Sequence, residues 1–446
     1  MTDRSVPMQS GEQSSRSGSR VDPWRGRYAA RAAGMVASEV RALFAVASRP
    51  EIVSLAGGMP NVSALPLDAI GTLMAELVAE RGAVALQYGS AQGDPGLRET
   101  ICRVMAAEGI DDAHPDDVMV TVGSQQALDL VTRVFVDPGD TVVTEAPTYV
   151  TALGVFAAYQ ANVVHVAMDE DGVVPEALTE TFARLEREGR PAKLFYTVPT
   201  FQNPAGVTLS AARRPQVVEV CRRAGVLLLE DNPYGLLHLD GDEPMRALRA
   251  DAPDDVIYLG SFSKTLAPGL RVGWALAPAA VREKLVLAAE SAMLSHSVFN
   301  QLAVDRYLRT QPWPEQMKDF RAMYRERRDT MLDALEKYMP PGVSWTRPAG
   351  GFFVWVTLPE GLDSKAMLPR AIQSRVAYVP GTGFYADGGG RQAMRLSYCY
   401  PPPERIRDGV RLLADVIGAE LRLRDVFGTS APATSTGPQA PGPDQA

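Results

Sequence analysis

The stretch "YLGSFSKTLAPGLRVGW", residues 258–274, contains an apolar strand that ends in Ser-Phe-Ser and is followed at once by a lysine. A Pro-Gly turn then leads to an arginine, so that Lys264 and Arg271 come to the same small region. Two like charges held together need an anion between them, or one of them must lose its proton. The stretch therefore predicts an anion-binding site, a lysine that readily loses its proton, or both.

Around this stretch, apolar strands alternate with helical segments. Strands are predicted at 118–123, 141–147, 194–199, 225–231 and 256–263, and a helix is predicted over 124–135. Continuous Val, Ile and Leu runs are typical of strands covered on both faces, which indicates a mainly parallel sheet in an α/β fold. In such sheets ligands bind beyond the carboxyl ends of the strands.

Polar side chains follow three of these strands. Asn203 comes after the strand at 194–199, Asp231 and Tyr234 lie at the end of the next, and Ser261 and Lys264 at the end of the third. Their spacings are each about one strand–helix repeat, so the side chains are expected to converge on one edge of the sheet. Any one of them alone is more often a turn or cap residue. Together they predict a site that contains an amide, a carboxylate, a phenol and an amine.

A fourth strand end suits an anion. The strand at 118–123 ends in Gly123, and the helix after it begins with Ser124 and Gln125. Free backbone N–H groups and the helix dipole at such a junction favour a phosphate, although Ser124 alone could simply cap the helix. Beside Lys264 and Arg271, the junction indicates a phosphate site.

The composition excludes several classes of protein. The 446 residues carry a formal net charge of −8, which argues against general binding to nucleic acid or to an acidic membrane. Three well-separated cysteines and four histidines indicate neither a disulfide framework nor a metal site, and favour a reducing compartment. No apolar run is long enough for a membrane span, and the N-terminus lacks an apolar signal core. We therefore expect a cytoplasmic protein.

Changes in composition divide the chain into five parts. Residues 1–26 and 428–446 are low-complexity segments predicted to be disordered. The region 75–310 is predicted to form a large domain around the sheet, and 311–427 a smaller α+β domain with a long amphipathic helix at 317–338. Residues 27–74 have no sheet of their own and are expected to pack with the smaller domain.

From about residue 30 to 420 the chain resembles the fold-type I aminotransferases of class I/II that depend on pyridoxal phosphate. It is most similar to the 2-aminoadipate and kynurenine branch. The resemblance rests on motifs in the same order, which include "LAGGMPN", "QYGSAQGDPGLRE", "GSQQALDL", "EAPTY", "QNPAG", "EDNPYG", "GSFSKTLAPGLRVGW", "RPAGGFFVW" and "MRLSYCY".

This resemblance implies a large domain with a mainly parallel seven-stranded sheet flanked by helices, and a smaller α+β domain. It also implies pyridoxal 5'-phosphate as cofactor and a ping-pong transfer of the amino group from an L-amino acid to a 2-oxo acid. We expect 2-oxoglutarate and glutamate to form one substrate pair. The partners expected are these small molecules and a second copy of the chain, without nucleic acid or membrane.

The resemblance also implies roles around the cofactor ring. Lys264 would hold the cofactor as a Schiff base and then act as general base and acid. Asp231 would pair with the pyridine nitrogen and keep it protonated. Asn203 and Tyr234 would hydrogen-bond the phenolic oxygen of the ring, and Tyr149 would stack on the ring face, although a tyrosine after a strand could also be a core residue.

For the phosphate, the resemblance implies side chains and backbone of Ser124, Gln125, Ser261 and Arg271. Ser263 is a further candidate, although the alternation of a continuing strand would point its side chain away from Ser261. Tyr88 resembles a tyrosine that reaches the phosphate from the neighbouring subunit, which implies a homodimer with shared active sites. Without the resemblance, Tyr88 would be taken for an interface or core residue.

For the substrate, Arg395 matches the arginine that pairs bidentately with the α-carboxylate. Without the resemblance it would be taken for a surface salt-bridge residue. Gly57 and Gly58 would let the backbone approach the substrate. Arg41 lies where an arginine in this branch meets a side-chain carboxylate, and the alternative is a solvated helix arginine.

Two other functions stay open at this point. The same cofactor site could catalyse β-elimination or a decarboxylating transamination. A transcription regulator with an aminotransferase-like sensor domain is the alternative from another class. About 26 polar residues precede the body and show no helix-turn-helix pattern, so the sequence does not favour a regulator.

Overall fold

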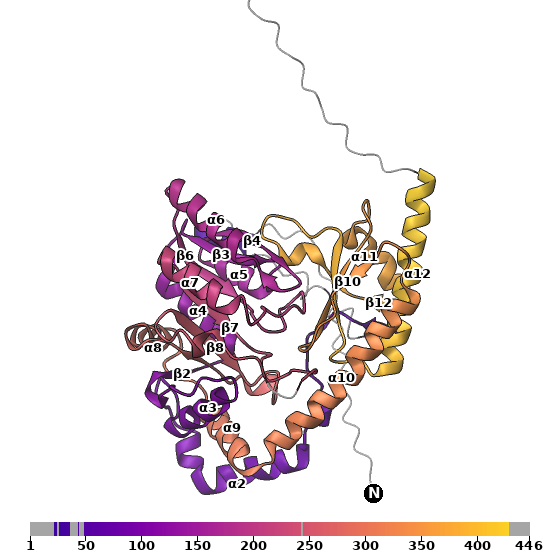
Figure 1. The fold of residues 1–446 in the computed structure, drawn as a ribbon. Coiled ribbons are helices and arrows are strands. Elements are labelled where there is room, and N and C mark those ends of the chain that lie inside the picture. Colours follow the sequence, from indigo (N-terminus) through magenta and orange to yellow (C-terminus); the bar gives the residue numbers. More distant parts are fainter. Residues whose placement is uncertain (1–21, 25, 36–42, 44–48, 242–243, 428–446) are drawn as a thin grey trace, which may run out of the picture.

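The computed structural model describes residues 22–24, 26–35, 43, 49–241 and 244–427 (Figure 1). The predicted tail at 428–446 and nearly all of the one at 1–26 lie outside these residues. Within the described ranges, no helix is long and apolar enough to cross a membrane, and no group of three or more His, Cys, Asp or Glu side chains could hold a metal ion.

A mixed sheet forms the centre of the larger part of the molecule. Its strand order is β2-β9-β8-β7-β6-β3-β4-β5, with β9 antiparallel to both neighbours, β5 antiparallel to β4 and the other pairs parallel. The strands are β2 (Val118–Thr121), β3 (Thr141–Ala146), β4 (Asn162–Asp169), β5 (Gly172–Val173), β6 (Ala192–Thr197), β7 (Leu227–Asp231), β8 (Val256–Ser261) and β9 (Gly273–Leu276).

Two features of this sheet position the site. Because β9 lies between β8 and β2 and runs against both, β2 points the same way as β8. The carboxyl ends of β2, β8, β7, β6 and β3 therefore meet at one edge. The eighth strand, beyond the seven that the sequence implied, is the two-residue β5, which a tight hairpin turn after Asp169 folds back onto β4.

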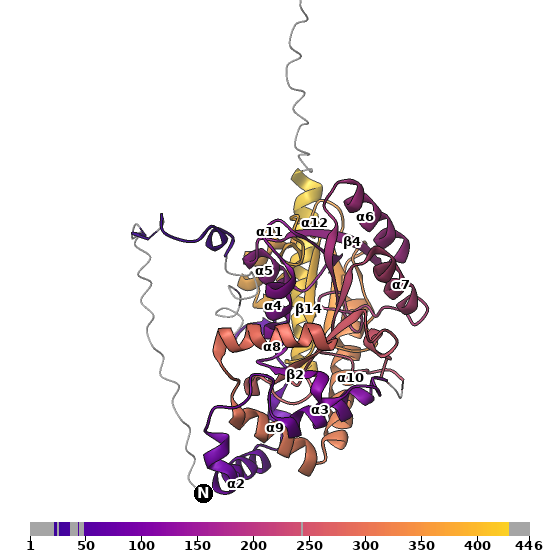
Figure 2. The ribbon, with the colours of Figure 1, turned by 90° about the vertical axis from the view of Figure 1, so that its left-hand side faces the viewer.

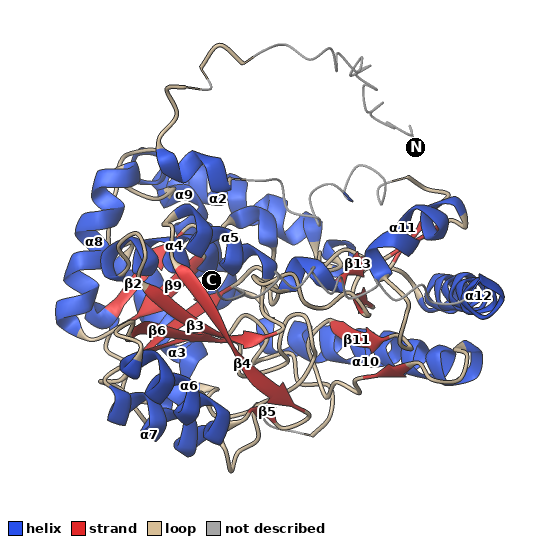
Figure 3. Ribbon diagram, turned by 90° about the horizontal axis from the view of Figure 1, so that it is seen from above, coloured by secondary structure: helices blue, strands red, loops and turns tan. Residues whose placement is uncertain are grey.

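Helices cover both faces of the sheet, as Figure 3 shows from above. One face packs against α4 (Ser124–Phe135), α5 (Val150–Ala158) and α8 (Ala279–Met293), and the other against α6 (Pro175–Arg187) and α7 (Arg214–Ala224), with α3 (Pro95–Ala106) beside β2. Within β6, Leu194 and Tyr196 join the core under α4 and α5, whereas Phe195 joins the core under α6 and α7. Burial on both faces explains why the strands are continuously apolar.

A smaller part of the molecule is built around a four-stranded antiparallel sheet in the order β10-β11-β14-β13. Its elements are α10 (Trp313–Tyr338), β10 (Ser344–Trp345), β11 (Phe353–Thr357), α11 (Ser364–Gln373), β12 (Val376–Ala377), β13 (Val379–Pro380), β14 (Ala393–Ser397) and α12 (Pro403–Phe427). From far away in the sequence, β1 (Val53–Ser54) pairs in parallel with β12. The division into domains at 75–310 and 311–427 stays a prediction.

Two further helices and several short 3-10 helices complete the described part of the fold. Helix α2 (Leu67–Ala85) packs on α9 (Val298–Thr310), and Figure 2 shows the pair at the end of the molecule opposite α6. Short 3-10 helices are η1 (Ala30–Gly34), η2 (Val62–Ala64), η3 (Pro115–Asp117), η4 (Leu248–Ala250), η5 (Pro268–Leu270) and η6 (Gly381–Phe384).

The secondary structure predicted around the sheet is confirmed. The helix at 124–135 has the predicted bounds, and the five predicted strands correspond to β2, β3, β6, β7 and β8. One difference matters for the site: β8 ends at Ser261, before the predicted end at residue 263.

Candidate active site

A cavity of about 320 Å³ lies at the edge where the carboxyl ends of the strands meet. This volume is at the lower end of the range for small-molecule sites, which is roughly 300–1,000 Å³. Among the described candidate residues from the sequence, the cavity brings together all except Gly57 and Tyr88. The candidates that line it are Gly58, Ser124, Gln125, Tyr149, Asn203, Asp231, Tyr234, Ser261, Ser263, Lys264, Arg271 and Arg395.

Lys264 follows β8 and points its ammonium group into the cavity. Its Nζ donates a hydrogen bond to the carbonyl oxygen of Gly58 at 3.0 Å. Burial, together with the positive charges of Arg395 and Arg271, lowers the pKa of Lys264 to about 8. A substantial fraction of this amine is therefore neutral near physiological pH, as a nucleophile or proton acceptor requires.

Asp231 lies at the end of β7 and is 4% exposed. Its Oδ2 accepts a hydrogen bond from the hydroxyl of Tyr196 at 2.8 Å, whereas its buried Oδ1 has no hydrogen-bond partner among the described residues. Burial raises the pKa of Asp231 to about 6, against the opposing effects of the Tyr196 hydrogen bond and the charge of Lys264. A positively charged N–H donor bound in the cavity would satisfy the free oxygen and hold the carboxylate ionised.

One part of the cavity can hold a phosphate. Helix α4 begins there with Ser124 and Gln125, directly after Gly123, whose φ is 75°. Arg271, with a φ of 53° after η5, lies just before β9 and donates from Nη2 to the carbonyl oxygen of Val122, just after the neighbouring β2, at 2.9 Å. A helix N-terminus and a guanidinium group thus meet at one place, which is the arrangement that binds a phosphate dianion.

Two serines complete this part of the cavity. Because β8 stops at Ser261, the chain turns and strand alternation does not carry over to Ser263. The Oγ atoms of Ser261 and Ser263 lie 2.8 Å apart, and the backbone N–H of Ser263 donates to Ser261 Oγ at 3.0 Å. The expected divergence of the two side chains is therefore not observed, and both line the cavity.

Arg395, on the central strand β14 of the smaller sheet, is 3% exposed. Its Nη1 donates to Asn203 Oδ1 at 2.9 Å and its Nη2 to the carbonyl oxygen of Ala56 at 2.8 Å, whereas the buried Nε has no partner among the described residues. The guanidinium carbon lies 4.1 Å from the centre of the Phe353 ring. Burial lowers the pKa of Arg395 to about 10, so it stays charged at neutral pH.

No carboxylate of the described residues forms an ion pair with Arg395, although it is almost fully buried. A buried charge without a counter-charge is costly unless a ligand supplies one. The alternative of a surface salt bridge is therefore wrong for Arg395. Its position suits an anionic group of a ligand bound next to Lys264 and Asn203.

Two tyrosines frame the cavity between these groups. Tyr149 follows β3 and precedes α5, and burial raises the pKa of its hydroxyl. Tyr234, 3% exposed, follows β7, and its ring is held edge-on against Phe352 and Phe353 at centroid distances of 5.5 and 6.0 Å. The aromatic contacts fix the ring of Tyr234 at the strand end.

The segment from Val53 to Met59 passes between the two parts of the molecule. It is bonded to the smaller part, since Leu55 N donates to the carbonyl oxygen of Ala377 at 2.8 Å and Cys399 Sγ donates to that of Met59 at 3.1 Å. A Cβ at Gly58 would lie 2.9 Å from the Phe353 ring. Glycine therefore lets this backbone reach Lys264.

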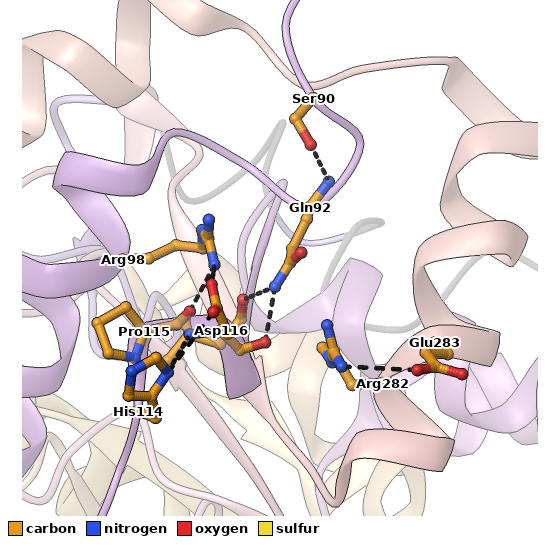
Figure 4. A network of polar contacts seen from close by, with 9 residues as sticks. Ser90, Gln92, Arg98, His114, Pro115, Asp116, Arg282 and Glu283 are labelled. Carbon is orange, nitrogen blue, oxygen red and sulfur yellow. Dashed lines mark hydrogen bonds and ion pairs between the residues drawn. The ribbon is translucent and has the colours of Figure 1, made fainter.

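Tyr88 does not line the cavity and is 76% exposed. The loop that follows it is well anchored, as Figure 4 shows: Gln92 N donates to Ser90 Oγ at 3.1 Å, and Gln92 Nε2 donates to the carbonyl oxygen of Asp116 at 2.8 Å. Arg98 in turn forms an ion pair with Asp116. Tyr88 is thus an exposed side chain next to an ordered loop, whereas Arg41 lies outside the described residues.

The family model for aminotransferases of class I and II matches residues 51–413. The chain belongs to this family. It is 42% identical over 396 residues to aromatic-amino-acid aminotransferase 1 of Thermococcus litoralis, which covers 89% of this chain and 95% of the relative.

Solved structures of two aminotransferases are also similar to this chain. A kynurenine aminotransferase of Pyrococcus horikoshii, in complex with PMP, has a TM-score of 0.85 at 42% identity and covers 90% of this chain and 98% of its own. The α-aminoadipate aminotransferase of Thermus thermophilus, in complex with N-(5'-phosphopyridoxyl)-L-leucine, has a TM-score of 0.82 at 35% identity and covers 90% and 99%.

The protein is therefore an aminotransferase of PLP fold type I, and its cofactor is pyridoxal 5'-phosphate. The chemistry of the cavity fits this group. The unpartnered Oδ1 of Asp231 suits the pyridine N–H, the amine of Lys264 suits the aldehyde, and the N-terminus of α4 with Arg271 suits the phosphate.

The prediction from the sequence did not include some residues that lie around this aminotransferase site. Phe353 and Val198 line the cavity but are apolar and carried no chemical signal. Tyr196 lies in an apolar strand and bonds Asp231. A buried tyrosine needs a partner for its hydroxyl, so its place in "LFYTVP" was a usable signal.

Replacing Gly123 with alanine should weaken cofactor binding, because the added Cβ would lie 2.6 Å from Arg271 Nη2. We expect the dissociation constant for pyridoxal phosphate to rise about tenfold or more, which is about the loss of one charge-assisted hydrogen bond. Titration of the apoenzyme followed by intrinsic fluorescence measures it.

Gly139→Ala is the matched control, since Gly139 also has a positive φ (92°) but no heavy atom within 4 Å of the added Cβ. It imposes similar backbone strain away from the cavity and should keep native affinity. Equal affinities for the two variants would show that Gly123 does not position Arg271.

The lowered pKa of Lys264 predicts how fast the apoenzyme attaches its cofactor covalently at different pH values. Only the neutral amine attacks a carbonyl carbon, so the rate should rise with pH up to about 8 and then level off. Stopped-flow absorbance between pH 6.5 and 10 measures this rate. A rate that keeps rising to pH 10 would mean that Lys264 has an ordinary lysine pKa.

Proposed function

We propose that this aminotransferase moves the amino group of an L-amino acid to a 2-oxo acid by a ping-pong cycle, with 2-oxoglutarate and glutamate as one substrate pair. The observation that carries the proposal is the buried Arg395, which has no carboxylate partner among the described residues and lies at the same cavity as Lys264 and Asp231. An α-carboxylate would supply the missing counter-charge and would place the substrate Cα next to the amine of Lys264.

When bound, pyridoxal phosphate acts as an electron sink that makes the Cα–H bond of the substrate acidic. Lys264 would hold the cofactor covalently and then carry the proton away from Cα and return it on the other side of the transfer. Its pKa of about 8 suits both directions of proton transfer. Asp231 would keep the pyridine nitrogen protonated through its free Oδ1.

The other candidates would orient the cofactor. Tyr149 would stack on the ring, and Asn203 and Tyr234 would hydrogen-bond its phenolic oxygen. Asn203 would also connect cofactor and substrate, because its Oδ1 accepts from Arg395 at 2.9 Å. The phosphate would be held by Ser124, Gln125, Ser261, Ser263 and Arg271.

The choice of amino donor would be made near the segment that carries Gly58. Arg41 would meet a side-chain carboxylate, which favours glutamate and 2-aminoadipate as donors. The similar proteins are named for aromatic amino acids, kynurenine and α-aminoadipate, so aromatic donors belong in the same assay.

The proposed active form is a homodimer in the cytoplasm, with Tyr88 reaching the phosphate of the other subunit. Tyr88, Leu86 and Leu294 are 76%, 74% and 53% exposed, and Gly89 N donates to Ser295 Oγ at 3.4 Å, which ties the loop of Tyr88 to the segment after Leu294. Exposed apolar side chains of this kind favour burial by a second copy of the chain. Three free cysteines suit a reducing compartment.

Replacing Lys264 with alanine should abolish the visible absorbance band of the bound cofactor and lower turnover by at least about 10²–10⁴-fold, the usual contribution of a general base.

The wild-type enzyme should convert glutamate, 2-aminoadipate, phenylalanine or kynurenine to the corresponding 2-oxo acid only when a 2-oxo acid acceptor is present, without releasing ammonia or carbon dioxide.

Lys193→Ala, which removes a half-exposed lysine that pairs with Asp140, is the control and should keep both band and turnover. Near-native turnover by Lys264→Ala would overturn the proposal. Ammonia or carbon dioxide as a stoichiometric product would point to elimination or decarboxylation instead.

Mixing two inactive or weakened variants tests the shared site. Tyr88→Phe should weaken cofactor affinity. In a hybrid dimer of one Tyr88→Phe subunit and one Lys264→Ala subunit, one of the two sites contains a native Lys264 together with the native Tyr88 from the other subunit. At limiting cofactor, the refolded mixture should exceed the mean activity of the two parents. Each variant refolded with itself is the control, and activity equal to that mean would show that Tyr88 does not act across subunits.

A further inference from the structure

The hydroxyl of Tyr196 lies behind the cavity, on the far side of the Asp231 carboxylate. We propose that Tyr196 is a positioning residue that holds one oxygen of Asp231 so that the other meets the pyridine nitrogen of the cofactor. This inference rests on the function proposed above, because it assumes that Asp231 pairs with the cofactor ring. Tyr196 does not itself line the cavity.

The sheet register brings the two residues together. Tyr196 of β6 lies opposite Leu229 of β7, and Asp231 is two residues further along on the same face. The tyrosine ring therefore leans diagonally along the sheet toward the strand end, where its hydroxyl donates to Asp231 Oδ2 at 2.8 Å. The ring cannot easily turn away, because Phe156 of α5 packs edge-on against it at 5.7 Å and 75°.

The direction of this hydrogen bond is fixed. Tyr196 is fully buried, and both its burial and the nearby charge of Asp231 raise the pKa of its hydroxyl well above the ordinary value. It stays protonated at every working pH and therefore always donates. The bond also leaves Oδ1 as the acceptor for a ligand, since that atom is buried without a partner among the described residues.

The charge of Asp231 depends on few neighbours. The groups that interact with it are Tyr196 from β6, Lys264 after β8, Tyr258 within β8, and the phenols of Tyr149 and Tyr234, which come from the segments after β3 and β7. Burial raises the pKa of Asp231, whereas Tyr196 and Lys264 lower it. Without the hydroxyl of Tyr196 the carboxylate would take up a proton at a higher pH, and a neutral carboxyl would no longer hold the pyridine nitrogen protonated.

The chain offers a matched control for this change. Tyr258 of β8 is also almost fully buried, and its hydroxyl donates to the buried Glu108 Oε2 at 2.7 Å. Glu108 does not line the cavity, and burial raises its pKa to about 7. Tyr196→Phe and Tyr258→Phe thus each remove one buried phenol–carboxylate hydrogen bond, but only the first removes a hydrogen bond to the carboxylate that lines the cavity.

The test compares wild type, Tyr196→Phe and Tyr258→Phe after their resistance to chemical denaturation has been measured. For each, the dissociation constant of pyridoxal phosphate from the apoenzyme is followed from pH 5.5 to 9. Affinity should fall as acid protonates Asp231, and this fall should begin about one pH unit higher in Tyr196→Phe. If affinity follows the ionised fraction of Asp231, that of Tyr196→Phe should be about twofold weaker at pH 7 and should approach a tenfold loss at pH 5.5, whereas Tyr258→Phe should follow wild type.

Asp231→Asn separates the inference from the function on which it rests. If Asp231→Asn binds the cofactor with a native pH profile, the proposed role of Asp231 is wrong. If Asp231→Asn changes the profile but Tyr196→Phe does not, the role of Asp231 stands and that of Tyr196 is wrong.

A double variant with both changes should bind like Asp231→Asn alone, because the tyrosine would act only through the carboxylate. Independent effects of the two changes, or an equal shift in Tyr258→Phe, would mean that Tyr196 contributes to general stability rather than to the position and charge of Asp231.

Discussion

Lys264, Arg271 and Arg395 bring three cationic groups to one cavity, whose described lining contains a single carboxylate, that of Asp231. In a partly desolvated site this excess of positive charge is costly, and it is relieved by a proton leaving the lysine or by anions entering the cavity. The lowered pKa of Lys264 reflects the first, and the geometry of Arg271 and Arg395 prepares for the second. A phosphate in one part and a carboxylate in another give each arginine a counter-charge.

The sheet makes this arrangement possible, because the ends of its strands hold polar and charged groups rigidly at the edge of the apolar core. Asp231 and Ser261 are the last residues of β7 and β8, and Gly123 comes just after β2. The continuously apolar strands bury both faces and leave only their carboxyl ends for polar chemistry. Arg395 is the exception, since it comes from a second sheet and must be carried to the cavity by the smaller part of the molecule.

Much of this could be predicted from the sequence where the signal was local. The run of strand, glycine and helix at 118–135 and the polar residues after β6, β7 and β8 lie where their spacing placed them. The role of Arg395 could be predicted only from the resemblance to the family, because nothing in "AMRLSY" distinguishes a buried arginine from a surface one. The position of the Ser263 side chain depends on where β8 ends, which the sequence placed two residues too late. The contact of Tyr196 with Asp231 depends on the register between β6 and β7, which the sequence of one strand does not reveal. Arg41 lies outside the described residues, and the role of Tyr88 stays a prediction.

The backbone from Val53 to Met59 contributes Gly58 and Met59 to the lining of the cavity, and most of its hydrogen bonds go to the smaller part of the molecule. It pairs with β12, donates from Leu55 to Ala377 and accepts from Cys399 and from Arg395, all in the smaller part of the molecule. Its carbonyl at Gly58 nevertheless accepts from Lys264, which belongs to the larger sheet. This hydrogen bond therefore joins a lysine of the larger sheet to a segment that is held by the smaller part of the molecule, so that any rotation of the smaller part would change its length.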